Sequence, residues 1–392
     1  MINHRYPRRR IRDAHDWQAG KSDFLWYRGQ DVGYDFGMKR LICISALLVT
    51  VLLASPITRA DQVDDYLKSQ MKQHRIPGLT LKIIRDGKAI KTAAYGLANI
   101  ELNVAAKPET VFEIGSITKQ FTAAGILLLA QEGKLSVDDK ISQHLKDTPE
   151  AWANVTIRHL LTHTSGIKSY TGLEGFQLWR HLTQAQFIKE IGRERVEFQP
   201  GDSWKYCNTG FSLLGYIIEN VSGRNYWDFM GERVFKPLGM LATTNRLPRL
   251  IIPNRAAGYE QTNHVWINRD SDLTEVFSAG AIASTVGDLA KWNAALDGDR
   301  LLNAANKAQM WTSVKLNDGK TRNYGFGWNV DAVEGHKNIG HGGSTSGFSA
   351  SIQRFPDDRL AVIILTNTDE EIATTLARKV ATFFFTKSST AR

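Results

Sequence analysis

The 392-residue sequence contains only two cysteines, Cys43 and Cys207. Two cysteines allow at most one intramolecular disulfide, and removal of an N-terminal leader that includes Cys43 would leave none. A chain of more than 300 residues can bury an ample core without such a crosslink. The histidines are scattered, with no HExxH and no paired-cysteine spacing, so we expect no metal site.

The sequence also lacks the usual signatures of nucleotide and nucleic-acid binding. No GxGxxG follows a strand-like run, and GGSTSG at 342–347 lacks the lysine and the helix of a phosphate-binding loop. The formal net charge of +9 falls to +4 without residues 1–60, and no basic stripe is present. We therefore expect no cofactor and no nucleic-acid partner.

No apolar run is long enough for a stable membrane span. The stretch from Leu41 to Ala54 is uncharged but shorter than the roughly 20 residues that a spanning helix needs. It follows a basic start at Met38, and a small-residue cleavage pattern ends at Ala60, so residues 38–60 resemble a signal peptide. We expect a periplasmic or secreted protein.

Residues 1–37 are rich in arginine and aromatic side chains and precede that basic start. The pattern favours translation from Met38. The alternative is a cytoplasmic extension ahead of a signal anchor. The last residues, 386–392, are expected to form a tail.

The pattern Ser-x-x-Lys occurs three times, at Ser69–Lys72, Ser116–Lys119 and Ser165–Lys168. Ser69 lies in a polar run typical of an exposed amphipathic helix, and Ser165 is followed by glycine in a loop-like segment. Ser116 instead opens an apolar run with helical period that ends at Gly133, a plausible helix cap. Only this pair is placed at the start of a buried helix.

Ser116 and Lys119 have the spacing of a nucleophile and its base. Residues i and i+3 share a helix face, so the amine can reach the hydroxyl and take its proton. Burial and the positive end of the helix both lower a lysine pKa, whereas arginine would keep its proton. The backbone N–H of Ser116 can stabilise an oxyanion. The alternative is that Ser116 is only a helix N-cap.

Tyr206-Cys207-Asn208 is the only Tyr-x-Asn in the chain. It follows the turn signal Pro200-Gly201 and precedes an apolar helical run, so it lies on a loop entering a helix. Tyr206 could shuttle a proton if nearby cations lower its pKa, and Asn208 could bind an amide. The alternative is a core tyrosine and an N-cap asparagine. Cys207 is interpreted as a packed small residue.

His341-Gly342-Gly343 precedes an alternating apolar strand at Phe348–Phe355. Glycines at the start of a strand allow a ligand to approach the backbone closely. The alternative is a glycine-rich turn with an incidental histidine.

The order of the predicted elements indicates an α+β fold. Asp86-Gly87 between two alternating apolar runs predicts a hairpin after a helix at about 61–74, and further strands and a helix follow at the C-terminal end. We expect an antiparallel sheet built from both ends of a domain at 61–385, flanked by helices, with a mostly helical insertion at about 116–275. The active site should lie between the two parts. Four aromatic residues could line it: Trp179, Phe187, Trp266 and Phe277.

The three motifs in this order resemble the serine β-lactamase and penicillin-binding-protein superfamily, in its class C, carboxypeptidase and esterase branch. The resemblance covers most of 61–385 and includes the segments FEIGSITKQFTAAGILLLAQEGKL, VTIRHLLTHTSGI, YCNTGFSLLGYIIENVSG, VFKPLGM, FSAGAIASTVGDLAKW and YGFGW. It implies that Ser116 is acylated, with Lys119 as its base and Tyr206 as a proton relay.

The resemblance also implies substrate-binding residues. Asn208 would bind the substrate amide or the lysine, His341, Gly342 and Gly343 would form the third motif, and the N–H of Ser344 would complete the oxyanion hole with that of Ser116.

Two departures from the family pattern bear on the substrate. His341 replaces the lysine common in β-lactamases, and Gly342 removes a hydroxyl. Both weaken recognition of the free carboxylate of penicillins and D-Ala-D-Ala peptides. The expected function is an esterase, amidase or D-amino-acid peptidase that acts on a small-molecule or peptide substrate. The alternatives are a β-lactamase or carboxypeptidase, and a penicillin sensor that acylates without turnover. The oligomeric state stays open.

Overall fold

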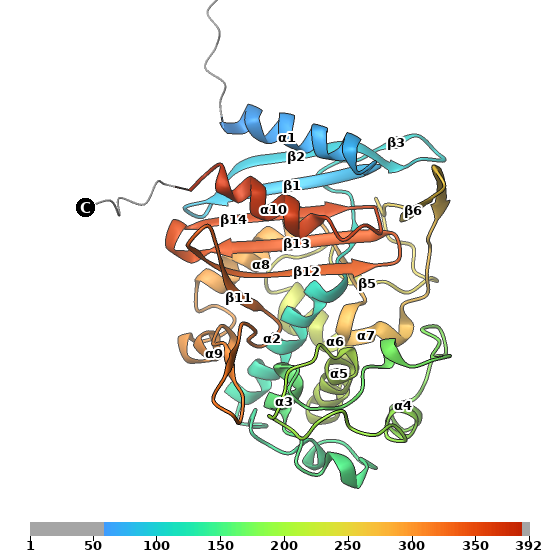
Figure 1. Cartoon of the computed structure of the whole chain (residues 1–392), viewed down its shortest axis with the longest axis vertical. Helices are drawn as coiled ribbons and strands as arrows, with labels where there is room; N and C mark the ends of the chain where they lie inside the picture. The colour runs from blue at the N-terminus through green and yellow to red at the C-terminus, as the bar shows by residue number, and fades with distance from the viewer. Residues whose placement is uncertain (1–58, 386–392) are drawn as a thin grey trace, which may run out of the picture. The chain divides into compact units, whose positions relative to one another are not determined.

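The computed structural model describes residues 59–385, and the expected tail and the leader, apart from its last two residues, lie outside them. A seven-stranded sheet has the order β11-β12-β13-β14-β1-β2-β3 and is antiparallel throughout (Figure 1). Its strands are β1 (Gly78–Arg85), β2 (Lys88–Asn99), β3 (Val104–Ala105), β11 (Asn329–Val333), β12 (His336–Thr345), β13 (Phe348–Phe355) and β14 (Leu360–Thr366). Because β1 pairs with β14, both ends of the domain share one sheet, which confirms the predicted fold class.

The predicted hairpin forms as the sequence indicates. Asp86 and Gly87 join β1 to β2 with φ of 53° and 74°, the left-handed conformation that two-residue hairpin turns require. At the C-terminal end, a single 3₁₀ turn at Pro356–Asp358 joins β13 to β14.

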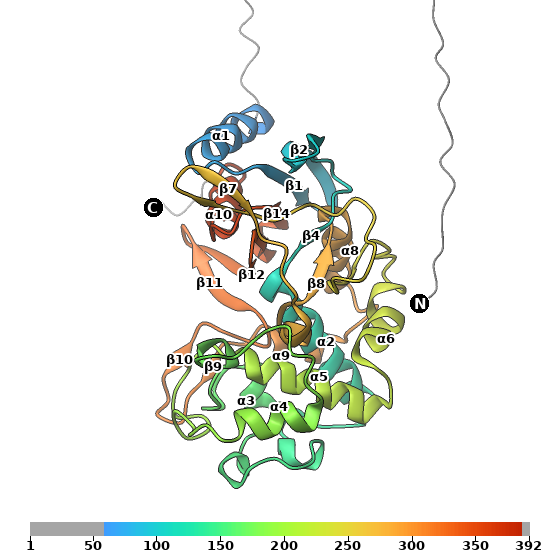
Figure 2. The same ribbon diagram turned by 90° about the vertical axis from the view of Figure 1, so that its right-hand side faces the viewer.

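Helices cover both faces of the sheet. On one face lie α1 (Arg59–Gln73) and α10 (Ala373–Thr382), whose apolar side chains, including Val63, Leu67 and Leu376, form one core with β1 and β14. On the other face lies α8 (Val286–Asp297) (Figures 1 and 2). This second face merges with the larger core of the helical part.

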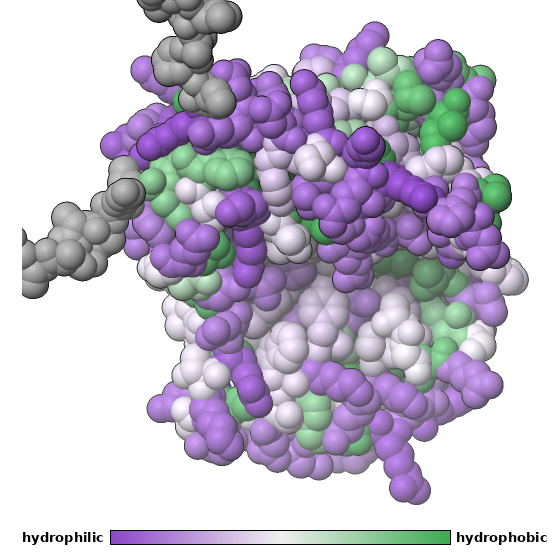
Figure 3. Space-filling model, turned by 45° about the horizontal axis from the view of Figure 1, so that its top comes forward, coloured by the Kyte–Doolittle hydropathy of each residue, from purple (hydrophilic) through white to green (hydrophobic). Residues whose placement is uncertain are grey.

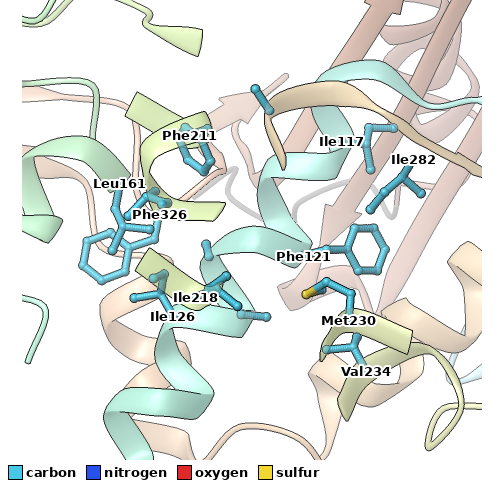
Figure 4. Close-up of a cluster of buried hydrophobic side chains, with 14 of the residues drawn as sticks. Ile117, Phe121, Ile126, Leu161, Phe211, Ile218, Met230, Val234, Ile282 and Phe326 are labelled. Atoms are coloured by element: carbon cyan, nitrogen blue, oxygen red, sulfur yellow. The ribbon is translucent and has the colours of Figure 1, made fainter. Parts of the chain in front are cut away.

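The helical part is built around one buried helix, α2 (Thr118–Gln131). Residues 118–129 of α2 are buried on every side, the burial expected of a helix with apolar side chains all round. Figure 4 shows Phe121 and Ile126 on this helix, packed among Phe211, Ile218 and Met230. The other helices are α3 (Ile157–Leu161), α4 (Gln184–Ile191), α5 (Asn208–Ser222), α6 (Tyr226–Met230), α7 (Phe277–Gly280) and α9 (Ala304–Met310).

Short strands connect the two parts. The strand β4 (Phe112–Glu113), just before Ser116, pairs with β8 (Ile282–Ser284), which also pairs with β5 (Thr244–Asn245). Two small hairpins complete the fold: β6 (Tyr259–Thr262) with β7 (Val265–Asn268), and β9 (Val314–Lys315) with β10 (Thr321–Arg322). Among residues 59–385, no helix is both long and apolar enough to cross a membrane.

The position of Phe121 yields a test of this core. Its ring is fully buried, with its centroid 4.4 Å from that of Trp292 and 5.7 Å from that of Phe235. Phe121→Ala should lower the free energy of unfolding by about 3–5 kcal/mol in urea denaturation, because it leaves a cavity. Ile251→Ala, at a side chain that is 96% exposed, should change it by less than about 0.5 kcal/mol. Equal effects would contradict the packing described.

Candidate active site

The three motifs meet at one cavity of about 490 Å³ between the sheet and the helical part. Figure 3 shows the surface hollowed between these two parts. The cavity is lined by Ser116, Tyr206, Asn208, His341, Gly342, Gly343, Ser344, Ser349, Ala350, Glu371 and Thr374. The structure therefore brings together seven of the eight predicted site residues as wall groups, and Lys119 lies directly behind Ser116.

Ser116 sits in a 3₁₀ turn, Gly115–Ile117, immediately before α2. Gly115 has φ of 50°, and a Cβ there would lie 2.6 Å from the amide nitrogen of Ser344. A Cβ on Gly343 would lie 2.0 Å from the carbonyl oxygen of Ile114 and 2.8 Å from the amide nitrogen of Ser116. The backbones of the turn and of β12 are thus in contact without side chains between them, which brings the amides of Ser116 and Ser344 close together.

Lys119 is fully buried, and its amine has three oxygen neighbours. Nζ lies 3.0 Å from Ser116 Oγ, 2.8 Å from Asn208 Oδ1 and 2.8 Å from the carbonyl oxygen of Ala279. A neutral amine has two N–H bonds and one lone pair. Asn208 Oδ1 and the carbonyl oxygen of Ala279 can only accept, so in the neutral amine both N–H bonds go to them and the lone pair is left for the serine hydroxyl. Burial lowers the pKa of Lys119 to about 7, as expected from the sequence.

Tyr206 lies beside this amine, with Lys119 Nζ 4.8 Å from its ring centroid. Its hydroxyl is buried, and the side chain of Ser116 is its hydrogen-bonding neighbour. The condition that nearby cations lower the pKa of Tyr206 is not met, because burial raises that pKa. The reason is that Lys119 and the ring of His341 are themselves shifted toward their neutral forms. Tyr206 is therefore a phenol, able to donate a proton.

Asn208 is the first residue of α5 and serves the lysine. Its Oδ1 accepts from Lys119, and its Nδ2 donates to Thr171 Oγ1 at 3.3 Å. Cys207 points away from the cavity, with Sγ donating to the carbonyl oxygen of Ile167 at 3.1 Å, and burial raises the pKa of its thiol to about 11. It is a packed, protonated thiol, as interpreted from the sequence.

His341 is held in one neutral tautomer. The glycine cluster that contains it lies inside β12 and not in a segment before the next strand, which corrects the sequence prediction. Nδ1 donates to the carbonyl oxygen of Gly342 at 2.5 Å, so Nε2 accepts from the hydroxyl of Tyr324 at 2.9 Å. Burial lowers the pKa of His341 to about 4. The third motif therefore supplies no positive charge at neutral pH.

Two aromatic residues behind the cavity were not identified from the sequence. Tyr324 orients His341, and His163 packs its ring centroid 4.3 Å from that of Tyr206 and 4.7 Å from that of Tyr324. His163 Nδ1 accepts from the backbone N–H of Cys207 at 3.1 Å, which fixes the loop that carries Tyr206. Burial holds the pKa of His163 well below its usual range. Both residues lie in recurrent family segments, but no spacing within the sequence indicates their partners.

A buried ion pair holds the nucleophile turn against β12. Glu113, in β4, accepts from Arg246 Nε at 2.6 Å and from Thr345 Oγ1 at 2.8 Å. Glu113 and Arg246 are only 3% and 2% exposed, so their desolvated charges need partners, and Arg246 pairs with Asp270 as well as with Glu113. Thr345 ends β12, immediately after Ser344. The carboxylate thus sets the separation of the two segments that carry the facing amides.

The other two Ser-x-x-Lys pairs have no part in the cavity. Ser69 is exposed on α1, and Ser165 Oγ accepts from the backbone N–H of Ile167 at 3.2 Å. Lys168 pairs with Glu194 at 2.8 Å.

The four aromatic residues proposed to line the cleft do not line this cavity. Phe187 is fully buried in the core, and Phe277 packs against Tyr226. Trp179 is 59% exposed. Aromatic residues were candidates by type alone, and their burial depends on neighbours distant in sequence. Within residues 59–385, no group of three or more His, Cys, Asp or Glu side chains is arranged to hold a metal ion.

Comparisons with known proteins agree with this geometry. A family model described as Beta-lactamase matches residues 63–383. A penicillin-binding protein of Bacillus subtilis is 32% identical over 323 residues, which cover 76% of this chain and 70% of that protein. Among solved structures, an octameric penicillin-binding protein homologue from Pyrococcus abyssi has a TM-score of 0.73 at 27% identity, covering 83% of this chain and 77% of the other. A D-stereospecific amidohydrolase from Streptomyces sp. has a TM-score of 0.69 at 29% identity, covering 80% and 95%.

The pKa of Lys119 gives a pH test of this site. A neutral amine is needed to take the serine proton, so labelling of Ser116 by a p-nitrophenyl phosphonate should rise with pH and level off above 7. At pH 6 the rate should be about tenfold below the plateau, since one unit below the pKa leaves about a tenth of the amine neutral.

Two variants identify the titrating group. Lys119→Arg should show no such rise, because a guanidinium keeps its proton. His341→Gln should retain the midpoint near 7, because the pKa of His341 lies far lower, at about 4. A midpoint that disappears with His341 would assign the titration to the histidine instead.

Proposed function

The chain belongs to the Beta-lactamase family, and from this premise we propose that it is a serine hydrolase that forms an acyl-enzyme on Ser116 with ester or amide substrates. The observation that carries the proposal is the buried amine of Lys119, which lies 3.0 Å from Ser116 Oγ and 2.8 Å from each of the oxygens of Asn208 and Ala279. In the neutral amine those two oxygens take both N–H bonds, which leaves the lone pair for the serine hydroxyl. A serine hydroxyl becomes an effective nucleophile when such a base takes its proton.

Acylation would proceed as follows from this arrangement. Ser116 Oγ forms a bond to the substrate carbonyl carbon as its proton passes to Lys119. The carbonyl oxygen becomes an oxyanion, and the amides of Ser116 and Ser344 are proposed to stabilise it. Tyr206 donates its proton to the leaving group as the carbon–leaving-group bond breaks, and the Lys119 ammonium restores the proton on Tyr206.

Deacylation would use the same groups in the reverse order. Water attacks the acyl carbon and gives a proton to Tyr206, which passes its own to Lys119. Lys119 then returns a proton to Ser116 as the acid departs. The raised pKa of Tyr206, caused by burial, suits this role because the residue is a neutral carrier between steps and never a stored phenolate.

The substrate preference follows from the third motif. With its pKa lowered to about 4 by burial, His341 cannot provide a cation for a free carboxylate, and Gly342 has no hydroxyl. We propose an esterase, amidase or D-amino-acid peptidase, a choice supported by the likeness to a D-stereospecific amidohydrolase. Penicillin hydrolysis, carboxypeptidase activity and acylation without turnover are alternative outcomes of the test with Ser116→Ala.

We also propose that the protein is exported. The support is the signal-like pattern at 38–60, of which only Arg59 and Ala60 fall among the described residues. N-terminal sequencing of the protein recovered outside the cytoplasm should begin near Asp61. Recovery of a form that retains residues 1–37 would contradict this proposal.

Ser116→Ala should abolish covalent chemistry and leave the fold intact. Intact-mass spectrometry would follow the protein with benzylpenicillin and with simple esters over time. Ester turnover that depends on Ser116, with unchanged penicillin, would support the proposal. A long-lived penicillin adduct would indicate a sensor, and rapid release of hydrolysed drug a β-lactamase. Ser69→Ala, in an exposed Ser-x-x-Lys pair, is the matched control and should behave like the wild type.

Gly343→Ala tests the contact between β12 and the nucleophile turn. The new methyl would lie 2.0 Å from the carbonyl oxygen of Ile114, so the two backbones must separate and the oxyanion hole must widen. Loss of one such donor costs about 10²–10³-fold in turnover, and a similar fall is expected here. Gly298→Ala, where a Cβ would meet no atom within 4 Å, should keep full activity. An active Gly343→Ala enzyme would refute this placement of the oxyanion hole.

A further inference from the structure

The cavity beside Ser116 has one charged group on its wall. Of the described residues that line it, Glu371 is the only Asp, Glu, Lys or Arg, and burial lowers the pKa of His341 to about 4 and raises that of Tyr206. Lys119 lies behind Ser116 and does not line the cavity. The wall therefore presents a carboxylate to whatever binds there and no matching cation.

Glu371 belongs to the loop between β14 and α10, and this loop is anchored on both sides. Before it, Asn367 Nδ2 donates to the carbonyl oxygens of Leu97 and Ala257, each at 3.1 Å. After it, the N–H of Ala373 donates to Ser349 Oγ at 3.2 Å. The backbone at Glu371 is thus fixed at the edge of the cavity.

The side chain of Glu371, by contrast, has no fixed partner. It is exposed, and within residues 59–385 no donor forms a hydrogen bond or an ion pair with its carboxylate. The preceding residue differs: Glu370 pairs with His74 Nδ1 at 2.7 Å and does not line the cavity. The dipole of α10 stabilises an acidic side chain just before its first turn. This stabilisation applies to Glu370 and Glu371 alike, so it does not distinguish them.

Glu371 lies next to the third motif and lines the same cavity as Tyr206. The first turn of α10 packs against the third motif, where a Cβ on Gly342 would lie 2.6 Å from Thr374 Oγ1. The charge of Glu371 is the smallest of the causes that raise the pKa of Tyr206, after burial and Cys207. In the proposed reaction Tyr206 gives its proton to the leaving group, so a leaving group bound beside Tyr206 shares the cavity with Glu371.

We propose that Glu371 is a specificity-determining residue that favours leaving groups bearing an alkylammonium and disfavours leaving groups that end in a carboxylate. The inference rests on the proposed acyl-enzyme function. The inference adds to the absence of a lysine in the third motif. A wall without a cation neither attracts nor repels a carboxylate, whereas Glu371 repels it.

Three butyrate esters that share an acyl group test the proposal. They are butyrylcholine, the neutral 3,3-dimethylbutyl ester of the same shape, and the anionic ester of 4-hydroxybutanoate. The measurement is kcat/KM for each ester, expressed relative to the neutral one. Glu371→Gln should lower the relative value for the cation about fivefold and raise that for the anion about fivefold, the size expected for charges about 4 Å apart in water.

Glu370→Gln is the matched control. It removes the same formal charge one residue away and should leave both relative values unchanged. Added salt should shrink the discrimination of the wild type and not that of Glu371→Gln. Unchanged relative values in Glu371→Gln, or equal shifts in both variants, would overturn the inference.

The failure of the proposed function would be distinguishable. If no ester is turned over in a Ser116-dependent manner, that function fails. The charge preference is then read from protection of Ser116 against the phosphonate. Choline should protect better than 3,3-dimethylbutanol in the wild type, and the two should protect equally in Glu371→Gln. Equal protection in the wild type would overturn the inference.

Discussion

The desolvated amine of Lys119 is the constraint on which the rest of the site depends. A lysine with no exposed surface is costly unless it loses its proton or finds acceptors, and here both conditions are met. Asn208 enters on α5 and Ala279 on α7, so two helices must close on α2 before the amine has its acceptors. The helices that pack around α2 therefore also supply the acceptors for Lys119 beside Ser116. Core packing and the geometry of the site thus depend on the same contacts, and α2 is buried on every side.

A second constraint acts across the boundary between sheet and helices. Gly115 and Gly343 allow two backbones to touch, and Glu113 with Arg246 and Thr345 holds them there. The glycines provide proximity and the buried ion pair provides register. Such an ion pair is weak evidence for stability, because its desolvation offsets its attraction, but it specifies one arrangement. Here the arrangement specified is the spacing of the amides of Ser116 and Ser344.

The sequence predicted the sheet, its two-ended construction and seven of the eleven residues that line the cavity because local motifs and periodic patterns indicate them. Asp86-Gly87 requires a tight turn, and apolar runs with period two or helical period define the elements. Features set by distant partners were missed. The pKa of Tyr206 is raised by its own burial, and the tautomer of His341 depends on Tyr324. Glu371 lines the cavity only because the start of α10 packs beside Gly342. The aromatic residues proposed for the cleft failed for the same reason.

The pairing of β1 with β14 has a consequence for synthesis. Residues 79–85 leave the ribosome nearly 300 positions before their partners at 360–366, and the third motif is also made late. The first hairpin must therefore wait, with one edge unpaired, until the last strands exist, since contacts between residues so distant in sequence form late and slowly. Until translation has produced β14, the seven-stranded sheet cannot be completed, and the chain stays incompletely folded. For a protein proposed to be exported, the topology itself delays folding until the chain can be threaded through a membrane.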